Sequence, residues 1–552
     1  MTDVGTRRLA SRVNDSNVKW YTLIAACFGL FMALLDNLVV NIAMPTIAKD
    51  LDANTSQLQW IVSAYTLVFA SLQITAGGLG DRLGRKRWFL IGLALFTVTS
   101  AVAAASQSIE MLITMRALQG LGAAFIMPLS LSLISNAFPP EERGKAVGIW
   151  SAISVSSIAL GPVIGGLVVE YLSWHWVFLI NVPIGIGAWI VTQAVVRESK
   201  DESGEVATDI PGTLLITGAI ASLTYGLIEA GNRGWGDPLI VTMLSLAVIL
   251  GVGFVYTESK VALPMVPLRF FRSGNFTGAN IDSFLISFMI SAIGFFMTLY
   301  QQNVHGFSAV RTGLALLPMV ISMMVLSPIG GTMINRVGPR KLVSFGMAVT
   351  GIGGLLLLRA SVNASYMDIV PGFVVMGLGM SFIWAPMTTA MLNSVEDSKS
   401  GIASAVNGAI REIGTAFSIA LLGTIATRKY QAEFRGSSDI QALRADSGNT
   451  FLQRTLDTIG SGAGFGGNVI RALPGTEQLG NAVATIQRDS GIAFVAGMER
   501  AIIIGSVALM AGSVVSYFLI SDEAHAPAEA AETASETAEE APRVGPVPSP
   551  AD

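Results

Sequence analysis

The stretch Gly77-Gly78-Leu79-Gly80-Asp81-Arg82-Leu83-Gly84-Arg85-Lys86-Arg87 decides the fold of this chain. It places five charges and four glycines in eleven residues, between apolar runs at 58–76 and 88–105. Each run is close to the length that crosses a bilayer, roughly 20 residues at a rise of about 1.5 Å per residue. We therefore interpret the stretch as a tight basic loop between two membrane helices. Loops rich in Lys and Arg stay on the cytoplasmic side.

The composition of the whole chain is that of a polytopic membrane protein. Of its 552 residues, 52% are hydrophobic and 13% are charged, about half the charged fraction of soluble proteins. The single cysteine, Cys27, excludes an intrachain disulfide, and three histidines argue against a histidine-rich metal site. The sequence has no phosphate loop of the Gly-x-x-x-x-Gly-Lys type. We expect no metal, no cofactor such as ATP and no nucleic-acid partner.

Fourteen apolar runs predict an all-α protein with about 14 membrane spans. If every span is real, the basic residues at 82–87, 143–145, 197–200, 260–272 and 336–341 all lie on one side, and both termini are cytoplasmic. The runs at 209–230 and 238–257 carry the weakest signal. The expected spans are 20–45, 57–78, 88–106, 109–135, 144–169, 174–196, 209–230, 238–257, 275–300, 310–333, 340–359, 367–392, 400–427 and 492–520.

A second segment similar to the basic loop predicts an internal duplication of the chain. Residues 330–341 resemble the first loop, and aligning Gly338 with Gly84 places Arg336 on Arg82 and Asn335 on Asp81. Two six-helix bundles related by pseudo-symmetry fit this pattern, with two inserted helices between them. The expected segments are a cytoplasmic N-terminus (1–19), a first bundle (20–196), the insert with its loops (197–274), a second bundle (275–521) interrupted by a polar outer loop (429–490), and a disordered cytoplasmic tail (522–552).

Several motifs resemble those of the fourteen-helix drug:proton antiporters of the major facilitator superfamily. They cover most of residues 20–520, and although each is weak alone, together they are specific. Two positions depart from the pattern, because His175 stands where arginine is expected and Glu412 where glutamine is expected. The motif residues are the basic loop itself, Asp36 with Asn41 and Pro45, Arg116 with Gln119, Gly120 and Gly122, Gly161 with Pro162, Gly165 and Gly166, residues 176–183, and Asn407 with Arg411 and Gly414.

Asp36 and Arg116 are the first candidates for proton coupling. Asp36 lies about sixteen residues into its span and Arg116 about seven residues into another span that runs in the opposite direction, so their depths in the membrane agree. Charges at such depth should face protein, water or a partner. The resemblance implies that the pair serves proton coupling. The alternative is a structural polar contact that fixes helix orientation.

Asp282 and Glu412 are further candidates for carrying a proton. Asp282 enters the ninth span among apolar neighbours, and it suits a proton carrier or an anchor for a cationic substrate as well as a hydrogen-bonded residue near the interface. Arg411 and Glu412 lie in the middle of their span. Adjacent residues on a helix diverge by about 100°, so the two cannot face one partner squarely. Arg411 suits a structural pairing and Glu412 a substrate or proton role.

Two glycine-containing motifs point to conformational roles. Small residues let helices approach closely, so Gly161, Pro162, Gly165 and Gly166 predict tight packing, and the resemblance implies a seal against proton leak. The resemblance also places Asp81 against a helix start near Lys399 in the other half, where it would stabilise the state closed to the cytoplasm. A merely topogenic loop is the alternative. The expected switch residues are Gly78, Asp81, Arg82, Gly84, Arg85, Lys86 and Arg336.

A substrate cavity is expected in the second half of the chain, because methionine and aromatic surfaces suit polyspecific binding. Ordinary helix packing is the alternative for most such residues. The expected lining is Asp282, Tyr300, Gln301, Trp384, Met387, Arg411 and Glu412.

These observations predict a monomeric antiporter in the cytoplasmic membrane that exports hydrophobic drugs or toxic compounds, cationic ones among the candidates, in exchange for protons. A proton symporter that imports a nutrient keeps the same fold and is the main alternative. An enzyme would need a cluster of nucleophile, base or metal ligands, and the scattered acids provide none. A sensor or channel would show no dependence on a proton gradient.

Overall fold

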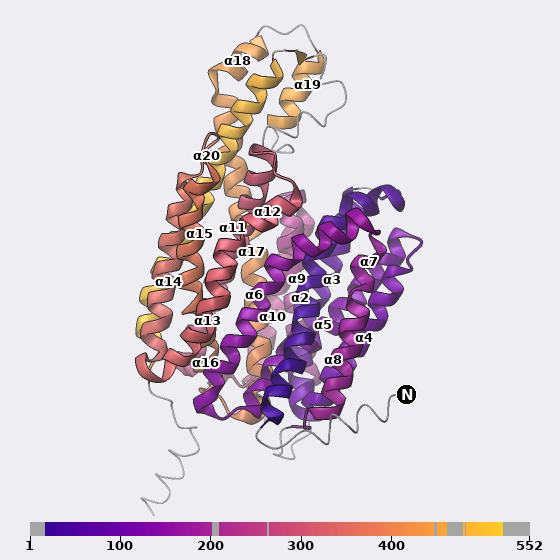
Figure 1. The fold of residues 1–552 in the computed structure, drawn as a ribbon, viewed down its shortest axis with the longest axis vertical. Coiled ribbons are helices and arrows are strands. Elements are labelled where there is room, and N and C mark those ends of the chain that lie inside the picture. The colour runs from indigo at the N-terminus through magenta and orange to yellow at the C-terminus, as the bar shows by residue number, and fades with distance from the viewer. Residues whose placement is uncertain are drawn as a thin grey trace, which may run out of the picture.

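The computed structural model describes residues 17–53, 55–200, 209–261, 264–445, 450–460, 479–480 and 482–522, and the regular structure in these ranges is helical (Figure 1). Thirteen helices of the described residues are long and apolar enough to cross a membrane. Another long helix, α6 (Pro140–Tyr171), occupies the position of the remaining expected span. The predicted all-α polytopic fold is confirmed, while the N-terminal 16 residues and the tail beyond Asp522 lie outside the described ranges.

The N-terminal half packs around α5, which contacts α2, α3 and α4. It buries large side chains such as Phe89, Phe96 and Phe178, each less than 2% exposed. The helices of this half are α2 (Val18–Asp50), α3 (Thr55–Leu83), α4 (Arg85–Ala104), α5 (Ile109–Ala137), α6 (Pro140–Tyr171), α7 (His175–Leu179) and α8 (Asn181–Val195).

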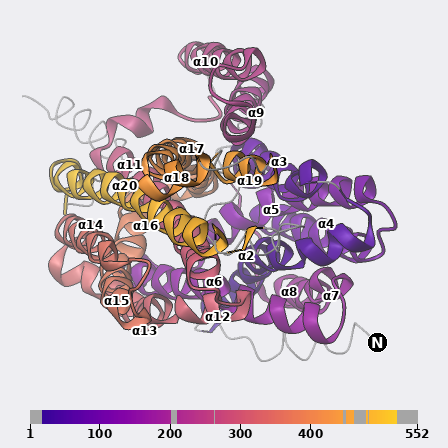
Figure 2. The ribbon, with the colours of Figure 1, turned by 90° about the horizontal axis from the view of Figure 1, so that it is seen from above.

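The C-terminal half forms the second bundle, and the insert stands beside both. Figure 2 shows α9 between α10 and the pair α3 and α17, with α10 outermost. The insert consists of α9 (Ile210–Arg233) and α10 (Pro238–Glu258). The C-terminal half contains α11 (Gly274–Leu299), α12 (Ala309–Ala315), α13 (Leu317–Val337), α14 (Pro339–Leu356), α15 (Tyr366–Ser381), α16 (Trp384–Leu392), α17 (Ser400–Gly436), α18 (Ser438–Ala445), α19 (Thr450–Thr458) and α20 (Ala482–Leu519).

Three expected spans are interrupted within the turn that precedes a proline. The span 174–196 breaks between α7 and α8, 310–333 between α12 and α13, and 367–392 between α15 and α16. Proline has no N–H to donate to the carbonyl one turn earlier, and its ring crowds that carbonyl. Pro183, Pro318 and Pro386 each stand in the first turn of the helix that follows the break, where proline is tolerated.

The two halves repeat one local structure at their basic loops. Gly84 and Gly338 both have positive φ, +115° and +87°, where glycine avoids the strain of a side chain. Glu198, which follows α8, accepts hydrogen bonds from the amides of Lys86 and Arg87 at the start of α4. In the same way, Asp522, which follows α20, accepts a hydrogen bond from the Arg340 amide at the start of α14. We call the end of the molecule that carries these loops the basic end, and the opposite end the far end.

The segment expected as a polar outer loop at 429–490 is partly helical. Helices α17 and α20 continue beyond the expected spans, and together with α18 and α19 they form a projection at the far end (Figure 1). The 37 residues of α17 measure about 55 Å at 1.5 Å per residue, well beyond a hydrocarbon core of about 30 Å. Phe434, Ile440 and Leu456 are fully buried there. These side chains give the projection its own small core.

The hydrogen bonds of Glu198 to the start of α4 lead to a prediction about stability. Replacing Glu198 by Ala removes the acceptor for two amide donors at the start of α4, which should cost about 1 kcal/mol of unfolding free energy. Thermal unfolding of the purified protein would show a lower midpoint for this variant. As a matched control, Glu433→Ala on the exposed surface of α17, where Glu433 pairs with Lys429, should change the midpoint far less. Equal midpoints for both variants would contradict the capping role.

Candidate functional site

A completely buried ion pair joins α2 and α5 in the N-terminal half. Arg116 donates through Nη1 to Oδ2 of Asp36, and both side chains are 0% exposed. Asp36 lies roughly 27 Å along α2 from its first residue, deep within a span. The structure therefore brings together the two charges whose depths match in the sequence.

Three polar side chains complete the surroundings of this pair. Asn181 donates to Oδ1 of Asp36 at 2.6 Å, and Gln119 donates to Ser100 at 2.7 Å while its carbonyl oxygen accepts from Arg116 at 2.9 Å. All three are buried, and they come from α8, α5 and α4. Side chains from α5 and α8 thus contact the carboxylate of Asp36 on α2, and Ser100 of α4 supports them through Gln119.

Arg116 also ties the pair to α3. Its Nε donates to the carbonyl of Ile61 at 3.2 Å, and its guanidinium lies 4.4 Å from the centre of the Tyr65 ring. The remaining nitrogen, Nη2, is buried without a hydrogen-bond partner. Buried polar groups without partners are costly.

A small cavity lies between the two halves. Gln73 is 1% exposed, its Oε1 has no hydrogen-bond partner, and its amide group lies against Gly408 of the other half, where an added methyl group would come within 2.4 Å of it. Arg411 faces the Trp384 ring at 5.9 Å. The lining is Gln73, Met127, Pro128, Leu131 and Trp150 from the N-terminal half and Trp384, Thr388, Ser404, Asn407, Gly408 and Arg411 from the C-terminal half.

Of the residues expected to line a substrate cavity, Trp384 and Arg411 line this one. Met387 and Glu412 belong to the same helices but are not among its lining residues. Glu412 lies 3.9 Å from Arg411, measured from Oε1 to Nε. No sequence pattern indicates that Gln73 and Trp150 of the N-terminal half contribute, because a polar or aromatic residue in an apolar run does not reveal which face it occupies.

Asp282 lies apart from this cavity, inside the C-terminal half. Its Oδ1 accepts from Ser516 of α20 at 2.5 Å, and Ser516 also contacts Met347 of α14. The adjacent Ser283 instead accepts from Asn407 of α17 at 2.7 Å. Successive helical residues point about 100° apart, which is why Asp282 turns away from α17. Its Oδ2 is buried without a hydrogen-bond partner.

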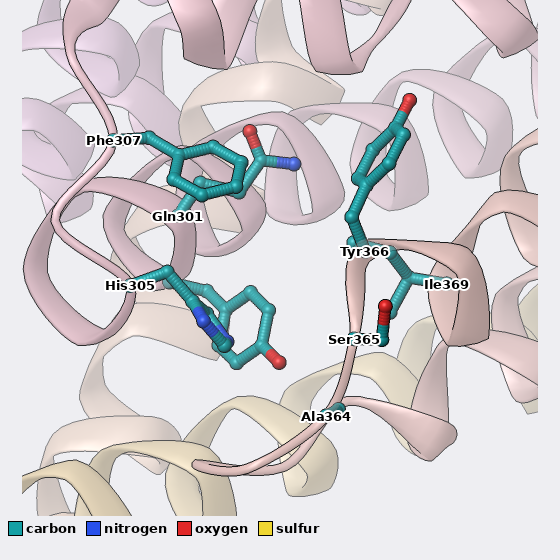
Figure 3. Close-up of a pocket in the computed structure, with 8 residues that line it drawn as sticks. Gln301, His305, Phe307, Ala364, Ser365, Tyr366 and Ile369 are labelled. Carbon is teal, nitrogen blue, oxygen red and sulfur yellow. The ribbon is translucent and has the colours of Figure 1, made fainter.

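Tyr300 and Gln301 line a second, water-sized space near the far end, apart from the cavity between the halves. Figure 3 shows Gln301 beside Phe307, with Tyr366 across the space. The hydroxyl of Tyr300 donates to the carbonyl of Ser361 at 2.7 Å. Burial lowers the pKa of His305, which also lines this space.

The two halves are joined at the basic end by contacts that we call the basic-end gate. Asp81 accepts from the amides of Gly401 and Ile402, at 3.0 and 2.7 Å, in the first turn of α17. Arg85 pairs with Asp81 at 2.7 Å and donates to the carbonyls of Asp397 and Ser398. A carboxylate at a helix N-terminus is favourable in both charge and hydrogen bonding.

Further contacts reinforce the gate. Arg143 donates to Asn393 at 2.8 Å and pairs with Asp397 at 3.0 Å. The backbones of Gly144 and Gly331 lie so close that a methyl group added to Gly331 would come 2.3 Å from the Gly144 carbonyl oxygen. The described conformation is therefore closed at the basic end.

The other predicted switch residues have local or peripheral positions. Arg82 donates to the carbonyl of Pro264 at 3.4 Å, Lys86 donates to that of Gln193 at 2.9 Å, and Gly78 lies against Met265. Asn335, the counterpart of Asp81, donates to the carbonyl of Glu141 near the start of α6. Arg336 is exposed at the rim of a polar cavity at this end. The second copy of the basic loop, at residues 330–341, thus also contacts the other half, but it has Asn335 in place of the Asp81 carboxylate.

The glycine motif of α6 packs this helix against two partners. Methyl groups added to Gly161 and Gly165 would come within 2.7 and 2.9 Å of Leu38 and Ile42 on α2. A methyl group on Gly166 would come within 2.5 Å of Val310 on α12. The close packing is therefore present. The side chain of Pro162 lies outside the described part of the structure, and the proposed role of the motif in preventing proton leak stays a prediction.

A sequence model of the Major Facilitator Superfamily matches residues 26–419 of the chain. The chain belongs to this superfamily. Its members are transporters, and with its many candidate spans the protein is a multi-pass membrane protein. The predicted family is thereby confirmed.

Relatives in this superfamily include resistance and export proteins. The tetracenomycin C resistance and export protein of Streptomyces glaucescens is 36% identical over 74% of this chain and 76% of its own length. The methylenomycin A resistance protein of Streptomyces coelicolor is 34% identical over 73% of this chain and 85% of its own length.

Solved transporter structures share the fold. The human organic anion transporter MFSD10 superposes with a TM-score of 0.59 at 12% identity, covering 92% of this chain and all of that one. The proton:xylose symporter XylE superposes with a TM-score of 0.55 at 14% identity, covering 76% and 91%.

The buried ion pair of Asp36 and Arg116 leads to a second prediction about stability. Arg116→Met leaves the Asp36 carboxylate buried without its cation, which should cost about 3–5 kcal/mol of unfolding free energy. The double variant Asp36→Leu with Arg116→Met removes both charges and should recover part of this loss. Thermal unfolding of the two single variants and the double variant gives the coupling between the residues. Strictly additive losses would show that the two side chains do not interact.

Proposed function

We propose that the protein is a proton-coupled antiporter that exports hydrophobic drugs or toxic small molecules by alternating access. The observation that supports this proposal is the Asp36–Arg116 pair, in which a carboxylate is fully buried within a membrane span and surrounded by polar groups from three other helices. Placing charged groups inside a membrane span is unfavourable in free energy, and residues of this kind usually serve a function. The names of the resistance and export relatives support the direction of transport.

In the proposed cycle, the described conformation has the gate closed at the basic end and Asp36 ionised against Arg116. A proton that arrives through the far end neutralises Asp36 and weakens its attraction to Arg116. Arg116 can then change its contacts with Ile61 and Tyr65 on α3, the helix that carries Asp81 at its basic end. The inward movement of one proton supplies about 2.3 kcal/mol per 100 mV of membrane potential.

The cavity between the halves is the proposed substrate site. Trp150, Trp384 and Met127 offer aromatic and apolar surface, while Gln73 and Asn407 offer hydrogen-bonding groups. A mostly apolar surface with a few polar groups is typical of small-molecule sites, but in the described conformation the space is only about water-sized, so a drug would fit only after the halves move apart. Arg411 brings a positive charge beside the negative charge of Glu412, so compounds of either charge, including lipophilic cations, remain compatible with the site.

The proposed setting is the cytoplasmic membrane, with the basic end and both termini in the cytoplasm. The concentration of basic residues in the loops of that end supports this orientation. We propose a monomer that works without a cofactor, with protons as the driving ion. Asp282 and Glu412 remain secondary candidates for carrying a proton.

A symporter that imports a small metabolite is the second candidate. A protein named riboflavin transporter from Clostridioides difficile is 31% identical to this chain over 433 residues, so the relatives include more than resistance proteins. Inverted membrane vesicles distinguish the two functions. Acidifying the lumen should drive an exported compound into the lumen under antiport, whereas symport would move the compound out with the protons.

Asp36 provides the direct test of proton coupling. In reconstituted inverted vesicles, Asp36→Asn should abolish gradient-driven accumulation of an exported dye, because an amide cannot bind and release a proton. Dye binding without a gradient should persist, because Asp36 does not line the cavity, but it should be weaker than in the parent, since an amide mimics the protonated carboxyl group that opposes dye binding in an exchanger.

Two controls accompany this test. Asp36→Glu keeps an ionisable carboxylate and should retain part of the gradient-driven transport. Asp50→Asn changes another carboxylate of α2, which accepts from Trp174 near the far end, and should leave coupling intact. Transport by Asp36→Asn at the parental rate would contradict the assignment.

A further inference from the structure

The inserted helix α9 lies along the seam where α3 of the N-terminal half meets α17 of the C-terminal half (Figure 2). Close contacts between α3 and α17 occur toward the basic end. Gly77 lies against Gly401, and Gln73 lies against Gly408. These α17 residues belong to the first turns of the helix, which begins at Ser400.

Helix α9 follows α3 over much of its length. The hydroxyl oxygens of Thr217 and Thr75 are 3.0 Å apart, and the ring of Tyr225 lies 6.1 Å from that of Trp60 near the far end. Toward the basic end, Thr213 donates to Met265, which itself lies against Gly78 of α3. The hydrogen-bonded and aromatic contacts attach the insert to the N-terminal half.

Helix α9 and the turn that follows it reach α17 farther from the gate. Leu227 is 2% exposed and packs in one cluster with Ala416 and Ala420 of α17. Just beyond α9, the indole nitrogen of Trp235 donates to Thr424 at 2.9 Å. These α17 residues lie roughly 24–36 Å along the helix from its start, farther from the gate than Gly401 and Gly408.

The position of α9 over the seam matters because a transport pathway between the halves is surrounded by lipid. If the halves separate along this seam during transport, a seam without a cover would open the interior to lipid. Ile419 of α17 is 48% exposed, whereas the adjacent Ala420 is 2% exposed and packs in the cluster with Leu227. The small side chains of Ala416 and Ala420 allow α9 to approach closely, and α10 packs on the outer side of α9.

We propose that α9 is a lateral seal, which closes the far half of the α3–α17 seam against lipid so that a hydrophobic compound leaving the cavity passes to water. This role rests on the proposed export function. A hydrophobic compound that escaped sideways would re-enter the bilayer from which an exporter must remove it. The seal would therefore determine how completely export clears lipophilic compounds.

Cysteine labelling tests the seal without requiring transport. In full-length protein with Cys27→Ser, single cysteines at Ala420→Cys and at Ile419→Cys are compared in phosphatidylethanolamine–phosphatidylglycerol liposomes. The probe is pyrene maleimide dissolved in the bilayer. We expect Ala420→Cys to react at least tenfold more slowly than Ile419→Cys. Reaction of the two cysteines at equal rates would overturn the proposal.

Variants of the insert extend the test to the contact itself. Adding Leu227→Ala and Trp235→Ala should raise the labelling rate of Ala420→Cys severalfold and leave that of Ile419→Cys unchanged. Thermal unfolding checks that the variant is folded. Should it fail to fold, Trp235→Phe, which loses only the hydrogen bond to Thr424, takes its place with a smaller expected increase. An unchanged rate in the folded variant would contradict sealing by these contacts.

A transport readout separates the seal from the proposed function. In inverted vesicles, the insert variant should reduce gradient-driven accumulation of the membrane-partitioning dye Hoechst 33342 more than that of the water-soluble cation methyl viologen. Equal reductions for the two compounds would count against the seal. If the parent protein transports neither compound nor any other tested drug, the proposed function fails, while the labelling rates still decide whether α9 covers the seam.

Discussion

The ion pair of Asp36 and Arg116 is the interaction on which the proposed mechanism depends. Charges of this kind are unfavourable in a low-dielectric interior unless they are paired and hydrogen-bonded. Here the pair is fully buried, and Asn181 and Gln119 add hydrogen bonds to it. A carboxylate in such surroundings can exchange a proton only when the surrounding helices give it access to water, which is the property that coupling requires.

Helix α3 physically connects this pair to the basic-end gate. Its residues Ile61 and Tyr65 contact Arg116, and its residue Asp81 binds the start of α17. The separation of Tyr65 and Asp81 along the helix is roughly 24 Å. We propose that α3 carries a change in the contacts of Arg116 to the gate, because one continuous helix makes both sets of contacts. The glycines at the crossings of α3 with α17 and of α6 with α13 let the halves meet closely when the gate is shut.

Much of this arrangement could be predicted from the sequence. The basic loop and the apolar runs predict the spans, and the depths of Asp36 and Arg116 predict their meeting. Other features carry no usable signal. Ser100 lies in an apolar run and reveals nothing of its contact with Gln119, and the orientation of Asp282 depends on the rotation of α11, which a single acid in an apolar segment does not define. Proline alone could not predict the breaks before Pro183, Pro318 and Pro386, because α5, α13 and α15 continue through Pro128, Pro328 and Pro371. The projection at the far end was missed because its small apolar core is spread over a mostly polar segment.

The central claim is that the carboxylate of Asp36 exchanges a proton during transport. The most direct measurement is the pH change in weakly buffered, detergent-solubilised protein when an exported dye is added. We expect the parent to release protons when the dye binds, because dye binding and protonation of Asp36 oppose each other in the proposed exchange, and we expect none from Asp36→Asn, although both bind the dye. Equal proton release from the two proteins would contradict the claim and would assign the coupling to another acid.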